Sequence, residues 1–198
     1  MEQDLFVSPA LAAGDVAVRE DRRAFQPVGK AKFFTLYLLT FGMYHIVWFY
    51  LHWANFKVAR KEPMWPVARS VFALFFTHAL TSEIDQEISR RDVRHAWAPK
   101  ALATTVVLLS LFLWVMGRAP SDVIPDAVAI PLSFVALVPL ALACWSIQDA
   151  ANIACGDPKG ETNAKFSWAN WIWIVLFGLL MLFVLMGTLL IVVDAVIG

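Results

Sequence analysis

Residues 168–193 read WANWIWIVLFGLLMLFVLMGTLLIVV, and the first charged side chain after this stretch is Asp194. A helix rises about 1.5 Å per residue and the hydrocarbon core of a bilayer is about 30 Å thick, so about 20 apolar residues in a row can cross it. Ser167, directly before the stretch, is a residue type that caps helix N-termini. The stretch therefore predicts a membrane-spanning helix.

Two further apolar stretches, 123–147 and 101–116, precede it. The first contains Pro131 and Pro139, which a membrane helix tolerates when neighbouring groups satisfy the freed carbonyls. The second is short for a span and lies between Lys100 and Arg118. Together the three stretches predict three membrane-spanning helices.

The composition also indicates a membrane protein. Of the 198 residues, 60% are apolar and 16% are charged, whereas an average soluble domain has about 25% charged residues. Acidic and basic residues are balanced at 16 each, so net charge predicts no nucleic-acid partner. We expect a polar cytoplasmic tail over 1–28 and one all-α, polytopic membrane domain over 29–198. Cys144 and Cys155 are too few for a disulfide framework, and Cys144 is expected to be a reduced packing residue.

Two earlier segments, 33–56 and 65–84, are ambiguous. Gly42 divides the first, so it either spans or turns back at residues 40–43. The second has Arg69 near its start and an unbroken apolar run of only six residues, 71–76, which is more typical of a re-entrant or interfacial segment. The predicted fold is therefore a helical bundle of three transmembrane helices plus two N-terminal segments that are spanning or re-entrant.

Lys and Arg near the spans set the orientation, because cytoplasmic loops carry the excess of positive charge. If neither early segment spans, 15 of the 16 Lys and Arg residues lie in the cytoplasm and only Arg118 lies outside. If both span, or only the first, the division is less one-sided. The charge pattern favours the first arrangement, whereas the apolar character of 33–56 favours insertion, and both alternatives stay open.

The run 39–50, LTFGMYHIVWFY, resembles the signature of the DUF4234-like proteins, which are small bacterial membrane proteins of unknown function. The matching positions are Thr40, Gly42, Tyr44, Trp48, Phe49 and Tyr50. Trp65, Pro66, Arg69 and Phe72 are similar to a second element of these proteins, and Gln148, Asn152, Asn163 and Trp168 to Asn170 to later ones. The resemblance implies the bacterial inner (cytoplasmic) membrane and no known activity. His45 and His78 depart from the pattern.

Several polar or motif positions are candidates for functional or structural roles. Gly42 allows a bend or a close helix contact, and Tyr44 and Trp48 carry rings suited to the interface. Ionisable groups at membrane depth point to function, although at the interface they can simply meet water or lipid phosphate. The full set of candidates is Gly42, Tyr44, Trp48, Arg69, His78, Gln148, Asn152 and Asn170.

Gln148 and Asn152 are four residues apart and so share a helix face. They could bond neighbouring helices or line a vestibule, or they could belong to a helix that continues through Ala154 and ends at residues 156–158. His45 and His52 also share a face, but their separation of about 10 Å along the axis is too great for one ion. No metal or other cofactor is expected.

The sequence contains no catalytic motif, so we expect no enzyme activity. The first hypothesis is an accessory or scaffold protein that forms a homo-oligomer or joins another membrane protein, with the lipid bilayer as its surroundings. The alternative is an oligomeric transporter or channel lined by Pro131, Pro139, Gln148 and Asn152. A weaker alternative is a lipid-acting enzyme that uses His45, His52 or His78.

Overall fold

The structure is a computed structural model that describes residues 23–197, and every regular element in that range is helical. The elements in chain order are α2 (Lys30–Leu39), α3 (Tyr44–Arg60), α4 (Pro66–Val71), α5 (Ala73–Arg90), α6 (Pro99–Met116), α7 (Asp126–Ala154), the 3-10 turn η1 (Glu161–Asn163) and α8 (Trp168–Ile197). The all-α prediction is confirmed.

Three helices are long and apolar enough to cross a membrane, namely α6, α7 and α8. They correspond to the predicted spans 101–116, 123–147 and 168–193. The start of α7 is later than predicted because Val123 and Ile124 form a turn on the carbonyl of Pro120. α7 ends at Ala154, which agrees with the alternative of a helix that continues past residue 147 through Ala154. These helices identify a membrane-embedded protein.

A Schellman motif ends α7. The amide of Asp157 bonds the carbonyl of Asn152 at 3.0 Å, and the amide of Gly156 bonds that of Ile153 at 2.9 Å. Gly156 has a φ of 71°, a conformation that glycine adopts without a Cβ penalty. The helix therefore stops where the chain must turn back toward α2.

The segment 33–56 is not one helix, and the spanning alternative for it is not supported. The chain reverses between α2 and α3, with φ values of 52° at Phe41 and 77° at Gly42. Thr40 holds the reversal, because its hydroxyl donates to Leu36 O at 2.7 Å and accepts the amide of Tyr44 at 2.9 Å. This is the turn at residues 40–43 that the sequence left open.

The segment 65–84 is also broken, into α4 and α5, with Phe72 between them. Pro66 begins α4, and α5 continues to Arg90. Neither of the two early segments therefore forms a single membrane-length helix. α2–α3 and α4–α5 form two consecutive hairpins.

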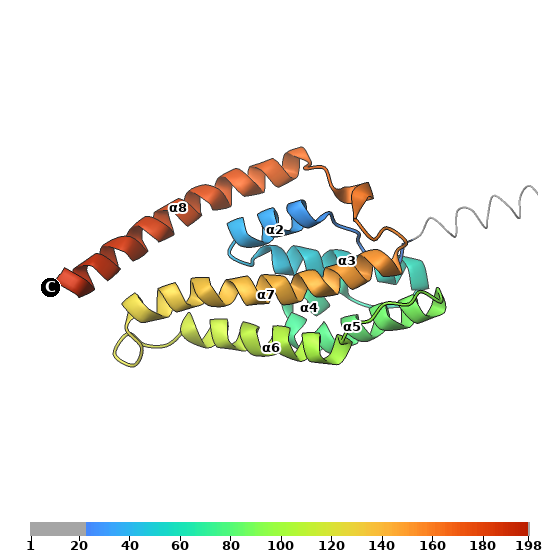
Figure 1. The fold of residues 1–198 in the computed structure, drawn as a ribbon, viewed down its shortest axis with the longest axis horizontal. Helices are drawn as coiled ribbons and strands as arrows, with labels where there is room; N and C mark the ends of the chain where they lie inside the picture. The colour runs from blue at the N-terminus through green and yellow to red at the C-terminus, as the bar shows by residue number, and fades with distance from the viewer. Residues whose placement is uncertain (1–22, 198) are drawn as a thin grey trace, which may run out of the picture.

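Both hairpins have their open ends at one end of the molecule, which we call the basic end: the end of α7, the start of α6 and the loops beside them. Arg60, at the end of α3, pairs there with Glu87 of α5. α2 runs antiparallel to the second half of α7, and the turn at Gly42 lies against Leu137, near the middle of α7. The hairpins therefore reach about halfway along the bundle (Figure 1).

The core is concentrated at the basic end and is rich in aromatic side chains. Trp48, Phe49, Trp53 and Phe56 of α3 are buried there. Both cysteines are buried and unpaired, as expected for Cys144. In contrast, α8 crosses α2 near its own start and then runs along the outside of the bundle toward the start of α7. None of its span is buried, compared with 39% of that of α7.

The predicted tail over 1–28 extends too far along the chain. Residues 1–22 lie outside the described residues, but Phe25 and Val28 are fully buried. Pro27 keeps this segment extended, because proline cannot continue a helix and restricts the residue before it. The charges of this region predicted the tail, but Phe25 and Val28 are apolar and belong to the core.

Candidate functional site

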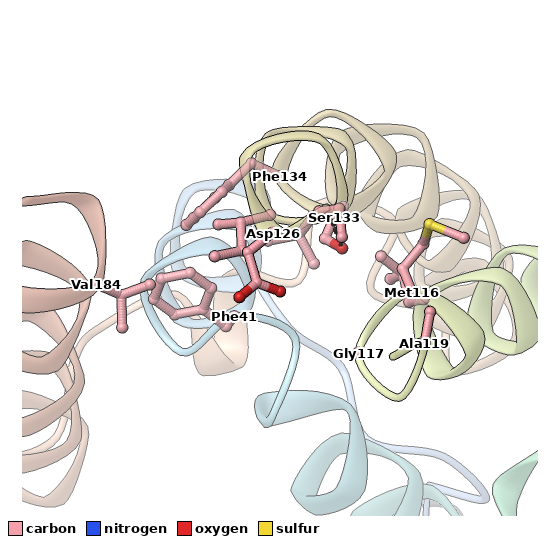
Figure 2. A pocket seen from close by; sticks show the side chains of 12 residues that line it. Phe41, Met116, Gly117, Ala119, Asp126, Ser133, Phe134 and Val184 are labelled. Carbon is pink, nitrogen blue, oxygen red and sulfur yellow. Dashed lines mark hydrogen bonds between the residues drawn. The ribbon is translucent and has the colours of Figure 1, made fainter. Parts of the chain in front are cut away.

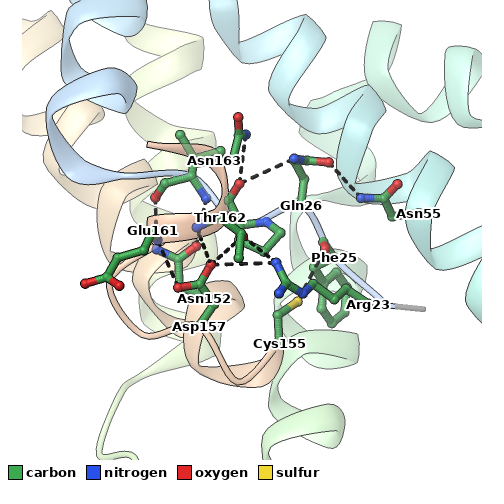
Figure 3. Close-up of polar contacts among 12 residues, drawn as sticks. Arg23, Phe25, Gln26, Asn55, Asn152, Cys155, Asp157, Glu161, Thr162 and Asn163 are labelled. Carbon is green, nitrogen blue, oxygen red and sulfur yellow. Dashed lines mark hydrogen bonds and ion pairs between the residues drawn. The ribbon is translucent and has the colours of Figure 1, made fainter. Parts of the chain in front are cut away.

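The segment 23–29 forms no helix or strand, and side-chain amides bond its backbone and hold it against α7 (Figure 3). Asn152 binds Val28 with both atoms of its amide. Its Oδ1 accepts the Val28 N–H at 3.0 Å and its Nδ2 donates to the Val28 carbonyl at 3.0 Å. Asn152 is fully buried, so this pair satisfies backbone groups that have no access to water.

Gln148, one turn earlier on α7, is the centre of the same network. Its Nε2 donates to the Gln26 carbonyl at 2.9 Å and to Asn152 Oδ1 at 2.7 Å. Its Oε1 accepts the indole N–H of Trp48 and lies 3.2 Å from Nε2 of His52. Gln148, Trp48 and His52 are all buried, so the network joins α3, α7 and the segment 23–29 in the interior.

The carbonyls of Pro27 and Phe25 also have donors. Asn163 Nδ2 donates to Pro27 O at 2.9 Å, and the Cys155 thiol lies 3.3 Å from Phe25 O. We call Gln148, Asn152, Cys155 and Asn163 the amide clamp, since together they satisfy every carbonyl from Phe25 to Val28. Gly160 permits the close approach, because a Cβ there would lie 2.2 Å from Val28 O.

The loop after α7 is organised around Asp157. Its carboxylate accepts the amides of Glu161 and Thr162 at 2.9 and 3.1 Å and lies 3.7 Å from Arg23. Partial burial raises the pKa of Asp157, but the bonds from Thr162 and Glu161 and the charge of Arg23 outweigh it, so the pKa is lowered. The ionised carboxylate thus fixes the loop that carries Asn163.

His52 is neutral in this setting. Burial lowers its pKa to about 4 from the usual 6.5, while the bond to Gln148 acts in the opposite direction. Its other ring nitrogen, Nδ1, has no partner among the described residues. Within residues 23–197 no three His, Cys, Asp or Glu side chains are grouped to hold a metal ion. The clamp contains three amides and the buried thiol of Cys155, and its amides hold backbone and do not act as nucleophiles or bases.

Trp48, Gln148 and Asn152 are thus brought together, whereas the other sequence candidates lie elsewhere. Gly42 forms the turn of the first hairpin, and Tyr44 follows it at the start of α3, against Phe33. Asn170 accepts from the amide and hydroxyl of Ser167 and so completes the cap that begins α8.

The two ionisable candidates have separate partners. Arg69 stacks on the ring of Trp53, with 4.1 Å between the guanidinium carbon and the ring centroid, a favourable cation–π contact. His78 is exposed on α5 and lies 3.1 Å from the Thr104 hydroxyl. His45 and His52 pack against the same ring, that of Trp48, whereas His78 lies apart on α5. The three residues suggested for a lipid-acting enzyme therefore do not share a site.

One cavity, of about 530 Å³, lies beside the clamp, where Phe25, Gln26 and Asn163 are among its lining residues. Two others lie away from the clamp. One of about 380 Å³ lies between α6, α7, the turn after α2 and α8. Figure 2 shows Asp126, Ser133 and Phe134 of α7 at this cavity, with Phe41 and Val184 on one side and Met116 on the other. A second, of about 410 Å³, lies between the tips of the two hairpins. Pro131, Pro139, Gln148 and Asn152 line neither of them, so these cavities do not support the predicted transport path.

Gln148 and Asn152 of the clamp were among the sequence candidates, but the segment 23–29 that they bind was not. Along the chain, Val28 lies 124 residues from Asn152, and Pro27 lies 136 residues from Asn163. The spacing of Gln148 and Asn152 left open whether they bond a neighbour, line a vestibule or belong to an ordinary helix extension, and the sequence carries no signal that their partner is the backbone of the segment 23–29.

Comparisons with protein-family models, with curated proteins and with solved structures find no match to this chain. The resemblance to the DUF4234-like proteins therefore stays a prediction that rests on the motif residues alone.

Proposed function

We propose that this protein is a non-enzymatic accessory or scaffold protein of the membrane that uses α8 to assemble with a second copy or with another membrane protein. The observation that carries the proposal is that no residue of the α8 span is buried. The core at the basic end is formed by other parts of the described chain and contains no residue of α8, so α8 is not needed to complete that core.

Exposed apolar surface alone does not drive helices together in a bilayer, because lipid tails are as apolar as leucine. Association needs close packing, which small residues permit. Gly178 and Gly187 of α8 have open space where a Cβ would lie, with no atom within 4 Å. A neighbouring helix could therefore approach the α8 backbone at either glycine, and because nine residues separate them, they lie on opposite sides of the helix.

The same open space makes a clean test. Gly178→Leu and Gly187→Leu add bulk without a clash inside the chain, so they should keep the fold and weaken assembly. Ala101→Leu, at an exposed position of α6, is the matched control. Particle mass in mild detergent and in nanodiscs should fall in the α8 variants only. A wild-type protein that is a lone monomer in both media, and that brings down no membrane partner, contradicts the proposal.

We also propose an arrangement in the membrane. The basic end faces the cytoplasm, following the positive-inside rule, and the two hairpins are re-entrant segments. Single cysteines at Glu62 and Asp122, in a chain with Cys144 and Cys155 replaced, test it with an impermeant thiol reagent on intact cells. Position 122 should label and position 62 should stay protected, whereas labelling at 62 would show that the first hairpin crosses. The bacterial inner membrane is the location that the motif resemblance supports.

A further inference from the structure

The cavity between the hairpin tips is unusual because polar side chains face it at membrane depth. Ser110 of α6 and Leu137 of α7 are among its lining residues. At about 1.5 Å per residue, Ser110 lies about 16 Å along α6 from its start, near the middle of a bilayer about 30 Å thick. The cavity therefore lies where hydrocarbon surrounds the protein.

His45 is the first polar group of this cavity. Its Nδ1 lies 3.4 Å from the Tyr37 hydroxyl and 3.6 Å from the Cys144 thiol, both of which can donate to it. When Nδ1 accepts, the neutral ring carries its proton on Nε2. Within residues 23–197 this Nε2 makes no hydrogen bond, although His45 lines the cavity.

The hydroxyl of Ser110 is the second polar group of this cavity. The other serine and threonine hydroxyls of this lining, Ser70 and Thr77, bond carbonyls of their own helices at 2.8 Å. The hydroxyl of Ser110 makes no such bond to any described residue, and it belongs to a different wall of the cavity from His45. Two donors without partners thus face one space, and a donor left without an acceptor in apolar surroundings costs free energy.

The mouth of the cavity indicates how a ligand would arrive. Exposed apolar side chains surround it, including Met43, Ile46, Val71 and Trp114. At this depth they face lipid tails, so entry is from the bilayer and the ligand must dissolve in it. An apolar ligand with carbonyl oxygens would accept hydrogen bonds from both donors.

We propose that the space between the hairpin tips is a binding site for a membrane-dissolved molecule that carries carbonyl oxygens, held by His45 Nε2 and the Ser110 hydroxyl. Tyr37 acts as a positioning residue, because its hydroxyl orients the His45 ring. Such carbonyls come from two sources, a quinone ring or a lipid ester, and the experiment separates them.

The test uses the full-length protein and native mass spectrometry in mild detergent. A short-chain benzoquinone is titrated as the probe, and co-purified phospholipid is measured before the probe is added. The variants are His45→Phe and Ser110→Ala, which each remove one donor, and Val71→Trp, which blocks the mouth at an exposed position. His78→Phe and Ser146→Ala are the matched controls outside the cavity.

We expect one adduct per chain in the wild type and in the controls. Binding should weaken about tenfold in His45→Phe and Ser110→Ala, the loss of about one hydrogen bond each, and be lost in Val71→Trp. A quinone adduct with this pattern assigns the quinone source, and a phospholipid adduct with the same pattern assigns the ester source. Equal binding in all variants, or no adduct of either kind, overturns the proposal.

Discussion

α7 and α8 are similar as sequences and opposite in their surroundings. They have 29 and 30 residues and both are long and apolar enough to span a membrane. The last part of α7 carries Gln148 and Asn152, which are fully buried and bind the segment 23–29. In α8, Asn170 bonds only the adjoining Ser167 and Thr188 bonds a carbonyl of its own helix.

The difference teaches how this chain divides its apolar surface. A buried amide in an apolar helix needs a specific partner, so it commits that helix to a packed position within the protein. A helix whose polar groups are satisfied locally makes no such demand and is left for lipid or for another protein. The experiments below sharpen or break this contrast, from the largest expected effect to the smallest.

The largest effect should come from Asn152→Leu, which leaves both backbone groups of Val28 buried without partners. We expect a loss of about 2–4 kcal/mol in the free energy of unfolding, measured by denaturant titration in mixed micelles, and faster hydrogen exchange at the Val28 amide. Thr188→Val on α8 is the matched control and should change stability by less than about 0.5 kcal/mol. Equal effects of the two substitutions would break the contrast.

The second effect is a pH dependence at His52. Its folded pKa of about 4 lies below the usual 6.5, so between these values the unfolded chain binds more protons and stability falls as the pH falls. At pH 5 the loss should be about 2 kcal/mol relative to pH 7. His52→Phe should reduce this dependence, whereas His78→Phe should not. A wild-type stability that is flat from pH 7 to 4.5 would refute the buried, neutral imidazole.

Two glycines should give effects of opposite sign. Gly42→Ala places a Cβ at a φ of 77° and 3.3 Å from a methyl group of Leu137, so we expect a loss of about 1–2 kcal/mol. Gly178→Ala lies in a regular helix with open space around it and should stabilise by up to about 1 kcal/mol. Thermal unfolding of both variants checks this, and a gain in stability for Gly42→Ala would exclude the strained turn.

The smallest effect should come from the edge of the network. Asn55 bonds only the side chain of Gln26, at 2.9 Å, and is half-buried. Asn55→Ala should cost about 0.5–1 kcal/mol, and the Val28 amide should keep its protection from exchange. Loss of that protection would mean that the segment 23–29 is held mainly by its outer contacts and not by the amide clamp.

Much of the helical layout could be predicted from the sequence. The uncharged run of α8 and the apolar run of α6 define their helices by length and polarity alone. The turn at Gly42 could be proposed, but not chosen over a straight span, because Gly42 fits both. The structure decides for the turn through the contacts of Thr40 on both of its sides.

The clamp could be predicted only in half. The spacing of Gln148 and Asn152 places them on one face, and bonding to a neighbouring segment was one of the alternatives for that face. That the partner is the backbone of Gln26 and Val28, more than 120 residues away, depends on tertiary packing that no local pattern encodes. The charged residues of 1–28 predicted a polar tail, although Phe25 and Val28 at its end are buried.

The most direct test of the account is a cysteine crosslinking scan along positions 176–190 of α8, in native membranes, with Cys144 and Cys155 replaced. The account predicts crosslinks to a second copy or to another membrane protein that recur every three to four positions, as one helix face in contact requires. If every position reacts with a membrane-soluble monofunctional reagent and none crosslinks to protein, lipid alone surrounds α8 and the proposed assembly through this helix is wrong.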